Sequence, residues 1–124
     1  MYSFPKEERL CGKKNIGVLL SEGNKYYLYP FAVKWMELTG DEINSINVLI
    51  AVPKSIFKKS VDRNKIKRLT REAYRRNKDI LTDHLKKGNK KIALMFMFKG
   101  GKIESYQEIE TKIKLILQFL AGSI

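Results

Sequence analysis

Residues 60–78 combine an apolar stripe with a cationic face, and this pattern constrains the fold more than any other feature of the chain. On a wheel that turns about 100° per residue, Leu69, Thr70 and Ala73 lie within about 60° of Ile66. The side between about 100° and 200° from Ile66 carries cations and one amide: Asn64, Lys67, Arg68, Arg71, Arg75 and Lys78. The segment is expected to form a helix that buries one side and presents positive charge on the other.

Positive charge is concentrated around this helix. The 124 residues include 25 Lys and Arg and 13 Asp and Glu, which gives a net charge of +12. From Lys54 to Lys78 there are 11 basic residues against Asp62 and Glu72 alone, or +9 of that total. A solvated helix face is the plain alternative, but such faces usually mix signs at i, i+4. The pattern therefore favours a surface that binds a polyanion.

The other hydrophobic patterns predict a small sheet with helices packed on it. Gly23 suits the end of a first helix over 13–22, and Ser60 and Ser105 suit the N-caps of two later helices. The expected order is α-β-β-α-β-α, a two-layer α+β sandwich in one domain spanning residues 1–124. The expected elements after the first helix are a strand at 26–38, a strand at 47–52, helices at 60–77 and 79–87, a strand at 92–98 and a helix at 106–120.

The segment 26–38 contains a proline, which leaves its structure open. Pro30 cannot donate to a sheet ladder, so it marks an edge, a bulge or a break into two strands. In one continuous strand, alternation would put Tyr27, Tyr29, Phe31, Val33 and Trp35 on one face. The opposite face would then carry Tyr26, Leu28, Ala32, Lys34 and Met36.

Composition places limits on location and on chemistry. The longest apolar run, 92–98, is far shorter than a membrane span, and the N-terminus has no apolar signal segment. Cys11 is the single cysteine and His84 the single histidine, so neither a disulfide nor a clustered zinc site is expected. No catalytic or metal-binding constellation is found, and a reducing cytoplasm is the expected location.

Residues 63–71 read Arg-Asn-Lys-Ile-Lys-Arg-Leu-Thr-Arg, which resembles the signature of the bacterial ribonuclease P protein family. Arg9-Leu10 before the first helix and Val52-Pro53-Lys54 before the basic loop also resemble that family, over roughly residues 4–120. The chain departs from the family pattern at Lys65, where arginine is usual, and at Ile16 and Leu20, where phenylalanines are common.

The resemblance implies a fold and a division of labour. The fold is a ribosomal protein S5 domain 2-like sandwich with a left-handed β-α-β crossover, against the general preference for the right hand. In this family the RNA subunit removes the 5′ leader of precursor tRNA, with Mg²⁺ held through RNA and no cofactor bound by the protein. The implied partners are ribonuclease P RNA and precursor tRNA, with no membrane and no DNA.

The resemblance also implies two groups of binding residues. One group would bind the RNA subunit: Lys54, Lys58, Lys59, Lys65, Arg68, Arg71 and Arg75. The other would bind the single-stranded leader in a cleft between the first helix and a sheet face: Ile16, Leu20, Tyr27, Tyr29, Phe31, Arg63, Asn64 and Lys67.

Charge and periodicity alone also fit a general RNA-binding or ribosome-associated protein that is not catalytic. A DNA-binding helix-turn-helix fits less well, because strands flank the basic helix. A membrane-surface helix would need large apolar residues opposite the charge, and Thr70 and Ala73 are poor anchors.

Overall fold

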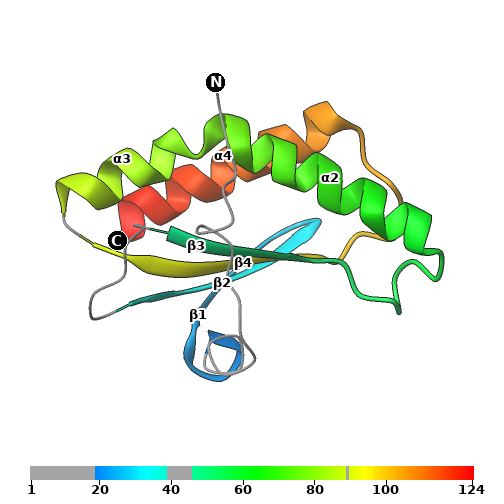
Figure 1. Cartoon of the computed structure of the whole chain (residues 1–124), viewed down its shortest axis with the longest axis horizontal. Helices are drawn as coiled ribbons and strands as arrows, with labels where there is room; N and C mark the ends of the chain where they lie inside the picture. The colour runs from blue at the N-terminus through cyan, green and yellow to red at the C-terminus, as the bar shows by residue number, and fades with distance from the viewer. Residues whose placement is uncertain (1–18, 39–45, 89) are drawn as a thin grey trace.

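The computed structural model describes residues 19–38, 46–88 and 90–124. A four-stranded sheet forms one layer, and three helices form a second layer over one of its faces (Figure 1). This arrangement confirms the expected two-layer α+β sandwich. The elements are β1 (Asn24–Leu28), β2 (Phe31–Glu37), β3 (Ile46–Ala51), α2 (Ser60–Asn77), α3 (Asp79–Lys87), β4 (Ile92–Phe98) and α4 (Tyr106–Ser123).

The strands lie in the order β1-β2-β4-β3. The β1–β2 and β2–β4 pairs are antiparallel, whereas β3 and β4 are parallel. Parallel neighbours need a long crossover, and α2 and α3 provide it here. The crossover therefore places the basic helix in the layer above the sheet, with its N-terminus one loop after β3.

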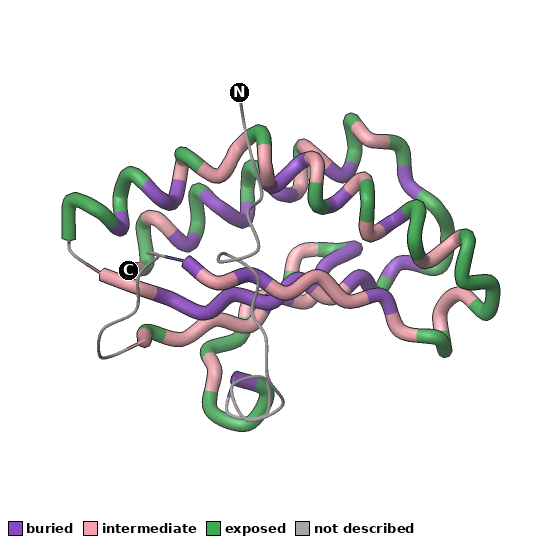
Figure 2. The backbone as a smooth tube through the Cα atoms, viewed as in Figure 1, coloured by how far each residue is buried: buried purple, intermediate pink, exposed green. Residues whose placement is uncertain are grey.

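The main core lies between the sheet and the helices. Figure 2 shows buried residues along most of β4 and at helical spacing along α2 and α4. On α2 the buried positions are Ile66, Thr70, Ala73 and Tyr74, and Leu69 is half-buried against the same core. The apolar stripe read from the sequence is thus confirmed, and it fixes which side of α2 remains in solvent.

The segment expected as one strand is two strands joined by a tight turn at Tyr29 and Pro30, whose peptide bond is cis. Of the three alternatives for Pro30, the structure therefore shows the break into two strands. In the hairpin, Leu28 pairs with Phe31 and Tyr27 with Ala32. Cross-strand partners share a face, so odd-numbered residues of β1 share a face with even-numbered residues of β2. The single continuous face expected for Tyr27 and Phe31 is therefore wrong.

The sheet face turned away from α2, α3 and α4 is called the open face below. A helix that ends at Glu22 lies on this side, where the buried Leu19 packs with Ala93 and Met95. This end confirms the expected end of the first helix, whereas its expected residues 13–18 lie outside the described part. The register assigns to the open face Tyr27, Ala32, Lys34, Met36, Leu49, Ala93, Met95 and Met97.

The two expected serine caps differ in outcome. Ser105 caps α4, since its Oγ accepts a hydrogen bond of 3.2 Å from the Glu108 backbone N–H. Ser60 is instead the first residue of α2, and the N-cap is Lys59, whose side chain makes no capping bond. The expectation for Ser60 was therefore wrong by one position, because the extended backbone continues to Lys59.

Candidate nucleic-acid interface

Cations gather on the solvent side of α2. Lys65, Arg68 and Arg71 are exposed, and Asn64 lies exposed among them. Their direction follows from the burial of Ile66, Thr70 and Ala73, because the two sides of one helix cannot both face the core. A polyanion could therefore approach this side of α2 without any rearrangement of the core.

Arg75 differs from the other cations because a carboxylate already holds it. Its Nε and Nη2 donate to the two carboxylate oxygens of Glu72 at 3.0 and 2.5 Å, and Arg76 Nε donates to the same carboxylate at 3.0 Å. The hydrogen bond from Arg75 is the main reason why the pKa of Glu72 lies below its usual value. Arg75 would therefore have to share or exchange this partner to bind a phosphate.

The loop between β3 and α2 adds three exposed cations, Lys54, Lys58 and Lys59. The loop is anchored at Phe57, whose ring stacks against Phe98 of β4 with centroids 6.0 Å apart. The anchor places the loop cations at the N-terminal end of α2. We call the exposed loop and helix cations that form no ion pair with any described residue the cationic surface: Lys54, Lys58, Lys59, Lys65, Arg68 and Arg71.

Arg63 turns toward this loop. Its Nη1 donates to the backbone carbonyl oxygens of Phe57 and Lys58, at 2.7 and 2.9 Å. Arg63 is half-buried, and so is Lys67, one turn further along α2. Part of the Arg63 guanidinium is therefore used within the protein.

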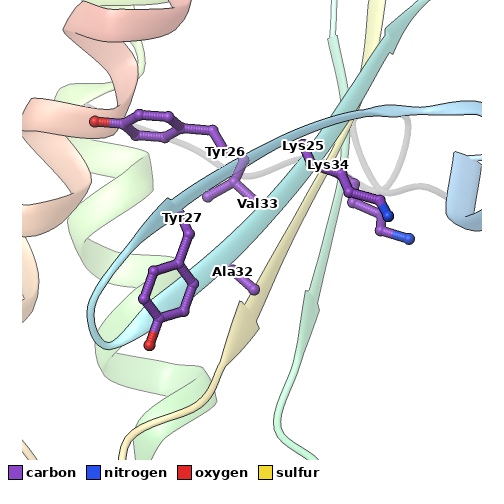
Figure 3. A pocket seen from close by; sticks show the side chains of 6 residues that line it. All are labelled: Lys25, Tyr26, Tyr27, Ala32, Val33 and Lys34. Carbon is purple, nitrogen blue, oxygen red and sulfur yellow. The ribbon is translucent and has the colours of Figure 1, made fainter.

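Two of the residues expected to bind the leader, Tyr27 and Leu20, lie on the open-face side of the sheet. Tyr27 is 61% exposed and Leu20 is 40% exposed. Next to Tyr27 lies a hollow of about 360 Å³ lined by residues of β1 and β2, in which Lys25 and Lys34 lie side by side (Figure 3). Lys34 Nζ donates to the Leu20 carbonyl oxygen at 2.5 Å and so joins the sheet to the end of the first helix.

Lys25 and Lys34 were missed as candidate binding residues. They are direct cross-strand partners, and like charges placed opposite each other destabilise a strand pair. A bound anion would offset that repulsion. The sequence signal is Pro30: a two-residue turn there predicts that Lys34, and not Phe31, shares the face of Tyr27.

Phe31 does not line this face, so its assignment to the leader cleft is wrong. It is 0% exposed and makes edge contacts with Phe96 and Phe98 in the main core, with ring centroids 6.2 and 5.6 Å away. The shift in parity across the hairpin turn is the reason. Tyr29 lies in the turn itself and is 51% exposed, and Ile16 lies outside the described residues.

The α2 residues assigned to the leader are not on the open face. Helix α2 lies over the other face of the sheet and contacts β3, which is an edge strand (Figure 1). A leader bound on the open face could therefore reach Arg63, Asn64 and Lys67 only by passing the β3 edge. On the open face, Lys34 bonds the Leu20 backbone and lines the same hollow as Tyr27, whereas the three α2 residues lie on the other side of the sheet.

Within residues 19–38, 46–88 and 90–124, no group of three His, Cys, Asp or Glu side chains is arranged to hold a metal ion. The same described ranges include no helix that is long and apolar enough to cross a membrane. His84 is exposed, with Nε2 3.1 Å from the Ile124 backbone oxygen. Cys11 lies outside the described residues.

Known proteins resemble this chain in both sequence and structure. A protein of Porphyromonas gingivalis named ribonuclease P protein component is 29% identical over 99% of this chain and 90% of its own length. The protein of that name from Chlorobaculum tepidum is 31% identical over 98% of this chain and 84% of its own length.

Two solved structures share the fold. The ribonuclease P protein of Staphylococcus aureus superposes with a TM-score of 0.71 at 19% identity, covering 91% of this chain and 94% of that one. The protein from Thermotoga maritima also gives 0.71, at 20% identity over 90% and 96% of the two chains. The sequence profile of the family described as Ribonuclease P matches residues 4–120. The chain therefore belongs to the ribonuclease P protein family.

Proposed function

We propose that this chain is the protein subunit of ribonuclease P and that it binds the RNA subunit through the cationic surface. The observation that carries the proposal is the exposure of six cations on one helix side and its adjoining loop. Among the described residues, no ion pair joins any of the six to a carboxylate. Each is therefore available to neutralise a phosphate and release a counterion.

The open face is the proposed site for the single-stranded 5′ leader of precursor tRNA. A leader varies in sequence, and an aromatic ring stacks on any base, so Tyr27 suits this substrate. Lys25 and Lys34, which lie side by side, would together neutralise a phosphate next to the stacked base, and Leu20 would contact the leader from the first helix. Tyr29 extends this platform at the hairpin turn.

In this proposal the protein binds and orients RNA, and the RNA subunit cleaves the bond. Magnesium ions would be held by RNA phosphates, so the protein would need no metal ligands of its own. This division of labour is supported by membership of the family, in which the relatives carry the name protein component.

Reconstitution tests this function against a general RNA-binding role. The purified chain is added to a ribonuclease P RNA transcript at low Mg²⁺, and cleavage of precursor tRNA is measured. We expect cleavage only when both components are present. Binding to unrelated structured RNA with the same affinity, without stimulation of cleavage, would instead support the general RNA-binding alternative.

The leader site is tested with Tyr27→Ala and Tyr29→Ala. Loss of base stacking costs roughly 1–3 kcal/mol, so the affinity of the holoenzyme for precursor tRNA should fall by about fivefold or more. Its affinity for mature tRNA, which lacks the leader, should stay within about twofold. Phe119→Ala is the matched control. The Phe119 ring is also partly exposed, but it belongs to α4 and stacks on Tyr26, away from the open face. Equal losses for precursor and mature tRNA would refute the leader site.

A further inference from the structure

Arg63 is in an unusual position for a cation. It lies in the first turns of α2, where the macrodipole favours negative charge, and Asp62 beside it follows that rule. The cost of a cation there is offset by its two hydrogen bonds to the Phe57 and Lys58 carbonyl oxygens. These carbonyl groups precede the helix and are not part of its internal hydrogen bonding.

The two carbonyl groups belong to the two peptide units on either side of Lys58. A residue's backbone conformation is set by the orientation of its two flanking peptide planes. Arg63 holds both planes from one nitrogen atom, at 2.7 and 2.9 Å. It therefore fixes the direction in which the Lys58 side chain leaves the backbone, while Phe57 anchors the same loop against Phe98.

We propose that Arg63 is a positioning residue, which fixes Lys58 and the neighbouring Lys59 beside the helix cations so that all of them meet RNA phosphates together. The inference rests on the proposed function, since it assigns how one part of the cationic surface is held in its binding conformation. Pre-arranged side chains lose less conformational freedom on binding. Arg63 would thereby strengthen RNA binding through Lys58, in addition to any contact of its own.

A double-mutant cycle between Arg63 and Lys58 tests this, with a ribonuclease P RNA transcript as the probe. Arg63→Ala should weaken binding about tenfold, Lys58→Ala by less, and the double variant within about twofold of Arg63→Ala alone, because the lysine is no longer positioned. The matched control is Arg68→Ala, an exposed cation of the same helix. Its effect should simply add to that of Lys58→Ala.

The Arg63→Lys variant separates the effect of the positive charge from the effect of side-chain length. Lysine keeps the positive charge but ends one bond short of the arginine Nη1, so it should not hold both carbonyl groups. We expect faster amide hydrogen exchange at residues 57–60 of the free protein in both Arg63 variants, with exchange in β4 unchanged. We also expect Arg63→Lys to bind RNA more weakly than the original protein, although its charge is the same.

The outcomes separate this inference from the proposed function. Additive losses for Arg63→Ala and Lys58→Ala, or full rescue by Arg63→Lys with unchanged exchange at 57–60, would overturn the positioning role and leave the cationic surface intact. A purely structural role would lower the stability of the fold but leave the salt dependence of RNA binding unchanged, which would also overturn it. If Arg68→Ala has no effect either, the proposed RNA-binding surface itself fails.

Discussion

Removing two cations from the cationic surface should change the salt dependence of RNA binding by an amount that the structure sets. Arg68→Ala combined with Arg71→Ala removes two exposed guanidinium groups from the middle of α2. Alanine has the highest helix propensity, and neither side chain is buried, so α2 should keep its conformation. The double variant therefore changes charge without changing the fold.

The magnitude follows from counting available cations. If each of the six cations of the surface neutralises one phosphate, the slope of log affinity against log salt is about −5.4, and with four cations it is about −3.6. Between 50 and 200 mM salt, the affinity of the original protein should fall by about 2,000-fold and that of the double variant by about 150-fold. Arg75 is left out of this count because Glu72 holds its guanidinium.

The assay is a titration of labelled ribonuclease P RNA with protein at four or more salt concentrations. Lys86→Ala with Lys87→Ala is the matched control, because these exposed lysines of α3 carry the same total charge outside the cationic surface. The control should retain a slope near that of the original protein. An unchanged slope in the Arg68 and Arg71 variant, or an equal flattening in the α3 control, would refute a localised docking surface.

Three further predictions concern the fold that carries these surfaces. Phe31→Ala should lower the free energy of unfolding by about 3–5 kcal/mol, because it empties a core position; a urea titration showing less than about 1 kcal/mol would return Phe31 to the exposed face. Glu104→Gln should increase stability at pH 7 but hardly at pH 4. The hydrogen bond with Glu108, followed by burial, raises the pKa of Glu104 in the folded protein. The contribution of Glu104 to folding stability is therefore favourable at a pH below its ordinary pKa and declines as the pH rises through the raised pKa. A destabilised glutamine variant at pH 7 would contradict this. Glu110→Ala should cost about 1–3 kcal/mol at pH 7. The hydrogen bond from Asn77 is the main cause of the lowered pKa of Glu110. The stabilisation by Glu110 is therefore present at a pH above its ordinary pKa and is lost as the pH falls through the lowered pKa. Parallel stability curves for the two proteins between pH 7 and pH 3 would contradict it.

The cationic surface could be read from the sequence because it depends on local geometry. A helix places residues three and four apart on the same side, so Ile66 and Thr70 identify the buried side and Arg68 and Arg71 the exposed one. The ranges expected for α2, α3 and β4 match the structure for the same local reason, and Gly88, for example, follows the last residue of α3. These positions needed no knowledge of the rest of the chain.

The open face depended on tertiary structure. Alternation assigns side chains to faces only within one uninterrupted strand, and the turn at Tyr29 and Pro30 reverses the parity between β1 and β2. The sequence left open whether Pro30 was a bulge, an edge or a break, and each alternative gives a different partner for Tyr27.

The sequence by itself determined that a helix with a single-signed cationic side exists and which residues form it, because helical periodicity is a property of neighbouring residues. Only the tertiary structure decided that Phe31 is core, that Lys34 joins Tyr27, and that Arg63 turns back onto the loop before α2. Those outcomes depend on strand register and on how the loop packs against β4, and contacts between distant segments set both.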